Sequence, residues 1–209
     1  YLRVYEAKFV LGAIAAALSE SDEIGYIADY PIYGTPASIN AFALGAQMVN
    51  PRAQIVLEWS TLPGHSPEAA LAARGVHIIS SRDISAPHLE SRAFGLYHEQ
   101  DGVIANLAMP IWNWGKLYEG IVRSILTGAW SDEGEHNADR AMNYYMGMST
   151  DAIDIICSQR LPARTRRLVD LLHERIRAGA FLPFVGPIVD QAGQVRVAAD
   201  VALTPQEII

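Results

Sequence analysis

The stretch Gly25-Tyr-Ile-Ala-Asp-Tyr-Pro-Ile-Tyr-Gly-Thr-Pro-Ala-Ser-Ile-Asn-Ala-Phe-Ala-Leu-Gly45 decides the fold of this chain. Residues Ile24–Tyr30 are apolar apart from Gly25 and Asp29, which predicts a buried strand. Thr35 can cap a helix, and Pro36 suits the first helical turn. The helix is expected to bury one face and to end at Asn50-Pro51; that face carries Ile39, Phe42, Ala43 and Ala46.

Strand and helix units of this kind recur along the first half of the chain. An alanine-rich helix is expected upstream of the quoted stretch, and a capped helix follows Ser66 and closes at Gly75. The expected elements are helices at Val4–Leu18, from Ser66 to Gly75 and around Ala86–Ala93, and strands at Ala53–Trp59, Val76–Ser80 and Phe94–Tyr97. Such short alternation predicts an α/β fold with a parallel doubly wound sheet.

The second half continues with more varied elements. An apolar strand at Val103–Ile111 precedes a helix that ends near Gly128, and the polar stretch Trp130–Arg140 is expected to be a solvated loop. The apolar face of that helix is expected to carry Leu117, Ile121, Val122 and Ile125. A strand at Asn143–Met148 and a helix at Pro162–Ala178 should follow, and the helix should bury Leu168, Leu171, Leu172 and Ile176. The last expected element is a hairpin at Leu182–Val197 with its turn at Gln191–Gly193.

Composition excludes several classes of protein. The chain has 209 residues, half of them hydrophobic, with a net charge of −7. That charge argues against nonspecific nucleic-acid binding, which needs a basic surface. The single cysteine, Cys157, rules out an internal disulfide and a cysteine-based zinc site. Because there is no run of 18 apolar residues, the sequence predicts no transmembrane helix.

Candidate ligand contacts follow the ends of the expected strands, since open α/β sheets bind ligands at the carboxyl ends of their strands. An aromatic and carboxylate set of this kind suits a small polar ring compound, because aromatic faces stack and carboxylates accept hydrogen bonds. The candidates are Tyr33, Asn40, Trp59, Asp83, Asp101, Trp112 and Trp114.

Each candidate also has a structural interpretation. Trp59 is equally consistent with a core or rim position, and Asp83 and Asp101 with helix caps or turn residues. Asn40 either binds ligand or ties down the neighbouring loop. Trp112 and Trp114 are not both expected to face a ligand. At least one of the two is expected to be a packing residue.

Catalytic motifs are absent from the sequence. There is no Gly-x-Ser-x-Gly elbow, no Walker loop and no Gly-x-Gly-x-x-Gly after a strand. The six histidines lack the spacing of metal ligands. We therefore expect a protein that is not an enzyme and that needs no cofactor or metal.

The chain resembles the basic membrane protein family, the substrate-binding lipoproteins of ABC importers that include purine nucleoside receptors. Two motifs are the most specific: Ile39-Asn-Ala-Phe-Ala-Leu-Gly-Ala46 and Phe184-Val-Gly-Pro-Ile-Val-Asp-Gln191. Other matching pieces, in the same order as in the family, are Gly25–Ala28, Asn50-Pro51, Trp59, Ala72–Gly75, Gly95–Asp101, Ile111-Trp-Asn-Trp-Gly115, Tyr118 and Thr127–Trp130.

The resemblance implies a type I periplasmic binding protein, in which two α/β lobes close on a ligand. Residues 1–102 and 140–209 would form the C-terminal lobe, and 103–139 would return to an N-terminal lobe that is otherwise missing from this chain. The chain also begins within a helix, with no strand before it, which agrees with a missing start.

The resemblance also assigns roles to three of the candidates and to a partner. Trp59 matches the aromatic residue that stacks on a purine base, Asp101 the acid that binds ribose hydroxyls, and Trp112 with Trp114 the Trp-Asn-Trp that faces the cleft. The acid usually found two residues after Trp59 is absent, and the Ser-Ser-Arg context of Asp83 is unusual. An ABC permease would be the partner, and the location would be extracytoplasmic, in the periplasm or on a lipid anchor.

The expected function is therefore capture of a small polar ligand, a purine base or nucleoside, for an ABC importer. The alternative is the effector domain of a transcriptional regulator, since the same fold serves as a ligand sensor there. With one lobe incomplete, the apolar surface of Val103–Ile125 is expected to drive self-association of this chain.

Overall fold

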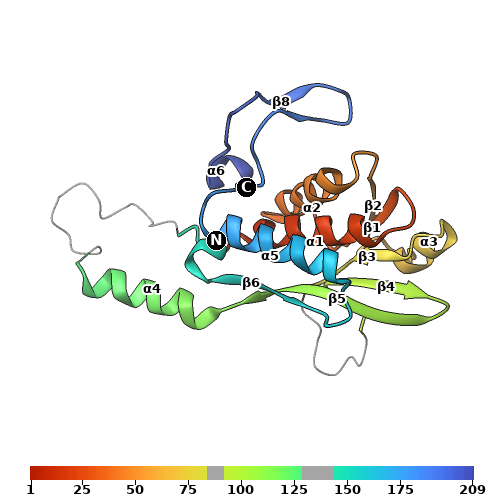
Figure 1. Ribbon diagram of the computed structural model, residues 1–209, viewed down its shortest axis with the longest axis horizontal. Helices are drawn as coiled ribbons and strands as arrows, with labels where there is room; N and C mark the ends of the chain where they lie inside the picture. Colours follow the sequence, from red (N-terminus) through yellow and green to blue (C-terminus); the bar gives the residue numbers. More distant parts are fainter. Residues whose placement is uncertain (84–91, 129–143) are drawn as a thin grey trace.

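The computed structural model describes residues 1–83, 92–128 and 144–209. They form one six-stranded sheet with helices around it and a separate two-stranded hairpin (Figure 1). The helices are α1 (Val4–Leu18), α2 (Thr35–Val49), α3 (Pro67–Ala73), α4 (Trp114–Leu126), α5 (Ala163–Arg177) and α6 (Pro205–Ile208), with a 3-10 turn at Met148–Thr150. The strands are β1 (Glu23–Ala28), β2 (Gln54–Trp59), β3 (Ile78–Ser80), β4 (Leu96–Gln100), β5 (Val103–Trp112), β6 (Ile153–Cys157), β7 (Ile188–Val189) and β8 (Val195–Val197).

The large sheet is mixed, which corrects the prediction of a parallel sheet. Its strand order is β2-β1-β3-β4-β5-β6, in which β1 pairs in parallel with β2 and β3, and the remaining pairs are antiparallel. Only Asp101 and Gly102 separate β4 from β5, and both have positive φ angles, of 51° and 76°. A two-residue turn of this kind makes a hairpin, because a parallel connection needs a much longer crossover.

Alternate residues of β1 face two different layers. Tyr26 belongs to the larger core cluster, which includes residues of α1, α2 and α5. Ile27 belongs to the smaller cluster with Leu71 of α3. The period of two along a strand therefore places α3 on the face of the sheet opposite the other three helices.

The helix α1 lies at the centre of the molecule and is buried over most of its length. Even its charged residues are enclosed: Glu6 is 3% exposed and Lys8 is 2% exposed. The Glu6 carboxylate accepts a hydrogen bond from the Met148 amide at 2.7 Å and lies 3.2 Å from the Arg3 guanidinium. Leu2 forms a parallel bridge with Met146, so the start of the chain is fastened to the segment that precedes β6.

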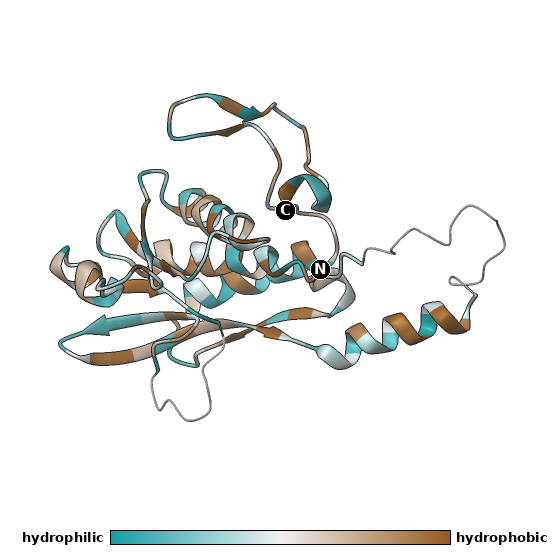
Figure 2. Cartoon of the chain, turned by 180° about the vertical axis from the view of Figure 1, so that it is seen from behind, coloured by the Kyte–Doolittle hydropathy of each residue, from teal (hydrophilic) through white to brown (hydrophobic). Residues whose placement is uncertain are grey.

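The helix α4 projects beyond the sheet at the end of β5, on the left of Figure 1. None of its residues is buried, although the helix is strongly amphipathic, as the alternating colours of Figure 2 show. Val122 is 53% exposed and Ile125 is 47% exposed. The sequence predicted this helix correctly; of its predicted apolar face, Leu117 and Ile121 are half-buried, whereas Val122 and Ile125 are exposed.

Other local predictions met mixed outcomes. Ser66 caps α3 as predicted, whereas Gly34, not Thr35, occupies the cap position of α2. The Thr35 amide already donates to Ile32, so Thr35 lies inside the first turn. The hairpin of β7 and β8 is confirmed. In α5, Leu171 is exposed and does not join the buried face.

Two further predictions concern connecting segments. The strand expected at Asn143–Met148 is reduced to the bridge at Met146 among the described residues. Most of the helix expected around Ala86–Ala93, and the loop Trp130–Arg140, lie outside the described residues.

Candidate functional site

A cavity of about 490 Å³ opens at the edge of the sheet where β1 and β3 end. Its walls come from α1, from the loop between β1 and α2, from the residues after β3 and from the end of β5. Parallel strands bring their carboxyl ends to one edge, and this is where the sequence predicted a ligand site. Strand β5 is antiparallel to β4, which is itself antiparallel to β3, so β5 points the same way as β1 and β3 and delivers its last residue, Trp112, to this edge.

The floor of the cavity holds a buried ion pair. The Lys8 ammonium donates to the Asp83 carboxylate at 2.5 Å and lies 3.4 Å from the Ser80 hydroxyl. The same ammonium lies 5.3 Å from the centre of the Tyr26 ring. Burial by itself acts to lower the pKa of Lys8, but Asp83 and Tyr26 outweigh burial and raise that pKa above its ordinary value. Lys8 is therefore a charged group at the base of the site.

A second charged group lies at the end of β1. The Asp29 carboxylate accepts a hydrogen bond from the Ser60 hydroxyl and lies 3.7 Å from the Arg82 guanidinium. The Thr61 hydroxyl donates to the Asp29 carbonyl oxygen at 2.6 Å. These contacts join the ends of β1 and β2 and the segment after β3, so they fix the shape of one wall.

Tyrosines form the rim of the cavity. Tyr33 is 68% exposed, and its ring meets the Tyr1 ring edge to face at 5.4 Å between centres. Burial raises the pKa of Tyr1 to about 12, with smaller contributions from the neighbouring tyrosines. The buried Tyr1 hydroxyl has no hydrogen-bond partner among the described residues. Tyr30 is also exposed at the mouth of the cavity.

Three of the residues predicted from the sequence line this cavity: Tyr33, Asp83 and Trp112. Trp59 ends β2 at the same edge of the sheet, since its partner in the ladder is Ala28 at the end of β1. Its side chain is partly buried against the core and is not among the lining residues. The structure thus brings together part of the predicted set.

Three other predicted residues lie elsewhere. Asp101 occupies the turn between β4 and β5, at the opposite edge of the sheet, because β4 is antiparallel to β3. This corrects the expectation that Asp101 follows a strand at the ligand edge. Trp114 begins α4, is 52% exposed and stacks on Tyr118 at 6.5 Å. Asn40 is exposed on α2, and no hydrogen bond of its amide is found among the described residues.

The sequence analysis missed Lys8, which is the most deeply buried charged residue lining the cavity. A lysine on a helix is ordinarily exposed, so the residue type alone gives no warning. The available signal was its setting, since Lys8 is flanked by alanine, phenylalanine and valine in a helix that is apolar on all sides. A helix of that kind is buried, and its charged residues must then be paired.

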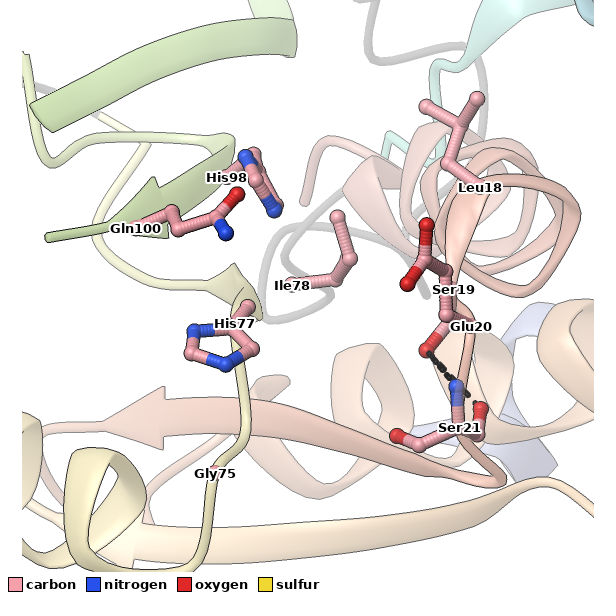
Figure 3. Close-up of a pocket in the computed structure, with 9 residues that line it drawn as sticks. All are labelled: Leu18, Ser19, Glu20, Ser21, Gly75, His77, Ile78, His98 and Gln100. Atoms are coloured by element: carbon pink, nitrogen blue, oxygen red, sulfur yellow. Dashed lines mark hydrogen bonds between the residues drawn. The ribbon is translucent and has the colours of Figure 1, made fainter.

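A second cavity, of about 400 Å³, lies at the opposite edge of the sheet. Figure 3 shows His77, His98 and Gln100 on one side of it, and Glu20 with Ser21 on the other. The two imidazole rings are 6.1 Å apart. Within the described residues no three side chains of histidine, cysteine, aspartate or glutamate gather as a metal site requires. Since no charged side chain lining this cavity is buried, the first cavity is the stronger candidate.

Comparison with known proteins bears on the class of the site. Residues 2–72 match the family described as Bmp, ABC transporter substrate-binding protein PnrA-like. A purine-binding protein of Brucella abortus (strain 2308) is 28% identical over 204 residues, which cover 91% of this chain and 56% of that protein. A protein of Haloferax volcanii named as an ABC transporter glucose-binding protein is 31% identical over 142 residues, which cover 61% of this chain and 36% of that protein.

Two solved structures share the fold at low identity. A solute-binding protein of an ABC transporter system from Conexibacter woesei superposes with a TM-score of 0.57 at 15% identity, over 87% of this chain and 63% of that one. A transcriptional activator of the comK gene from Bacillus halodurans gives a TM-score of 0.60 at 14% identity, over 87% of this chain and 65% of that one.

The chain spans about half the length of the Brucella relative, and a smaller share of the Haloferax one. None of the helices that the structure describes is both long enough and apolar enough to cross a membrane.

Proposed function

We propose that this chain, a member of the Bmp/PnrA-like family of ABC transporter substrate-binding proteins, binds a purine base or nucleoside in the cavity at the ends of β1 and β3. The family is one of binding proteins and not of enzymes. The observation that carries the proposal is the buried Lys8–Asp83 pair below an aromatic rim. The similarity to a purine-binding protein supports the choice of ligand.

The chemistry of the cavity favours a neutral polar ring. Its two carboxylates, Asp29 and Asp83, each lie beside a cation, Arg82 or Lys8. Paired charges of this kind leave little net charge for an ionic ligand but still offer hydrogen-bond acceptors. The exposed ring of Tyr33 and the indole of Trp112 provide flat apolar surfaces on which a base can stack. Trp59 remains a proposed contact at the same edge.

The arrangement of lobes is also proposed. The sequence predicted one α/β lobe from 1–102 and 140–209 and a segment 103–139 that reaches a second lobe. Because β5 (Val103–Trp112) pairs with β4 and β6 in the same sheet, we assign only the part that begins with α4 to that segment. The exposed apolar face of α4 supports this assignment, because a helix with none of its residues buried needs a surface to cover it. In the intact protein the ligand would then be enclosed when the two lobes close. An extracytoplasmic location and an ABC permease as partner follow from the same family membership as proposals.

Calorimetric titration of the intact, folded protein tests the proposal. Adenosine, guanosine, inosine and adenine are the ligands, and glucose is included because of the Haloferax relative. Heat of binding for at least one purine and none for glucose is the expected result. Folded protein that gives no heat with any purine would rule out the purine proposal.

A second function is kept because a transcriptional activator shares this fold. In that case the chain would sense its ligand for a DNA-binding module. The sequence that the gene encodes before Tyr1 separates the two proposals. A signal peptide with a lipid-attachment cysteine supports transport, and a helix-turn-helix supports regulation.

A further inference from the structure

The chain contains two lysines, Lys8 and Lys116, in opposite environments. The Lys8 side chain is 3% exposed and the Lys116 side chain is 55% exposed. A buried ammonium is costly unless it is paired and hydrogen-bonded, because it has lost its water. Lys8 meets this condition only through residues that line the ligand cavity or end the strand beneath it. The residues that stabilise the buried charge of Lys8 are therefore the same residues that shape the ligand site.

The contacts of Lys8 define one carboxylate orientation. The ammonium binds Oδ1 of Asp83, while Ser80 and the Tyr26 ring hold the ammonium from other directions. The second oxygen of Asp83, Oδ2, has no hydrogen-bond partner among the residues that the structure describes. The Asp83 side chain is 17% exposed, and Asp83 is one of the residues that line the cavity. One carboxylate oxygen is thus fixed and the other is left for a ligand.

We propose that Lys8 is a positioning residue for ligand recognition, which orients Asp83 so that Oδ2 accepts an N–H or O–H donor of a neutral ligand. This inference rests on the proposed function. The donor is an amine of the base or a hydroxyl of the sugar. A cationic ligand gains little here, since Asp83 is already paired with Lys8. An anionic ligand would meet a carboxylate at the floor of the cavity.

Ligand selectivity separates two possible roles of Lys8, which are orientation of Asp83 and stabilisation of the fold. If Asp83 accepts a hydrogen bond from one ligand group, an analogue without that group binds more weakly to the wild-type protein. Loss of Lys8 lets the carboxylate turn away, so the parent ligand and that analogue should then bind alike. A residue that only stabilises the fold would weaken both ligands by the same factor.

The test is calorimetry on the intact protein with adenosine and three analogues: purine riboside, which lacks the amine, and 2′-deoxyadenosine and 3′-deoxyadenosine, which each lack one hydroxyl. The variants are Lys8→Met, Lys8→Gln and Lys8→Arg, with Lys116→Met as the matched control. Circular dichroism confirms folding, and Lys8→Gln carries the test if Lys8→Met does not fold.

We expect Lys8→Met or Lys8→Gln to bind adenosine about tenfold more weakly, the loss of one hydrogen bond to a charged group. The preference for adenosine over one analogue should disappear with it. Lys8→Arg should keep the preference, and Lys116→Met should match the wild type. Unchanged affinity, or equal weakening of all four ligands, would overturn the inference and leave the proposed function intact. Folded wild-type protein that binds none of the four would overturn both.

Discussion

Gly12 of α1 lies directly against the main chain of Phe42 in α2. A Cβ atom at Gly12 would come within 2.0 Å of the Phe42 carbonyl oxygen. The contact is reciprocal, since a Cβ atom at Gly45 of α2 would come within 1.9 Å of the Phe9 carbonyl oxygen. Two glycines therefore let the helices meet backbone to backbone. Because α2 begins beside the cavity, this packing also sets where the rim residue Tyr33 lies.

Gly12→Ala and Gly45→Ala should each destabilise the protein by about 1–3 kcal/mol or more, because the helices must move apart to admit a methyl group. Urea unfolding measures the loss. Gly115→Ala is the matched control: it lies in a helix, its Cβ would meet nothing within 4 Å, and the change should be neutral or slightly stabilising. Equal stability of all three variants would contradict the close approach of α1 and α2.

Tyr33 and Trp59 are two of the three aromatic residues that we propose to contact the ligand, and Trp112 is the third. Replacing Tyr33 or Trp59 by alanine should weaken purine binding by roughly 1–3 kcal/mol, the value of one stacked base. Calorimetry measures both variants. Tyr118→Ala on α4 removes an exposed aromatic ring that does not line the cavity and should leave affinity unchanged. A variant with wild-type affinity removes that aromatic residue from the proposed site.

Cys157 should react slowly with thiol reagents in the folded protein. Burial raises the pKa of its thiol to about 11, and the smaller effects of neighbouring charges do not reverse this. Since the thiolate is the reactive form, labelling at pH 8 should be roughly a hundredfold slower than in urea-unfolded protein. The rate should rise about tenfold per pH unit as the pH approaches the raised pKa. Equal rates before and after unfolding would show that the thiol is not protected.

The apolar stripe of α4 should make this chain self-associate when it is prepared alone. The stripe consists of Trp114, Tyr118, Val122 and Ile125, all of which are about half exposed. Light scattering should detect dimers or larger species, and Val122→Glu with Ile125→Glu should shift them toward monomer. Arg123→Glu, on the same helix but outside the stripe, is the control. A monodisperse wild-type monomer would contradict the prediction.

The sequence predicted most elements of the fold because their periodicity and end signals agree. The helix Val4–Leu18 has its predicted bounds, and the elements around Gly25–Gly45 and the final hairpin are also confirmed. Strand direction was the main failure. Short apolar strands look alike whether they pair in parallel or antiparallel, and only the Asp101-Gly102 turn carried the information. The strand at Ile153–Cys157 was missed because five residues give too few periods to recognise.

The candidate site was predictable in part for the same reason. Tyr33, Asp83 and Trp112 follow strand ends that do meet at one edge of the sheet. Asp101 was misplaced as soon as one strand was given the wrong direction. Lys8 belongs to no motif, so only its position in a buried helix could identify it. A charged side chain in such a helix must be paired with another buried group.

The burial of α1 has a consequence for how the chain folds during synthesis. Its two enclosed charges take partners far along the sequence, Asp83 for Lys8 and Met148 for Glu6. The ribosome releases α1 long before Met148, so the helix cannot complete its contacts until most of the chain has emerged. Helix α2 emerges early and can cover one side of Phe9–Leu18, but the other sides of this apolar segment remain uncovered throughout that interval. This segment is accordingly the place where a holding chaperone would bind the nascent chain.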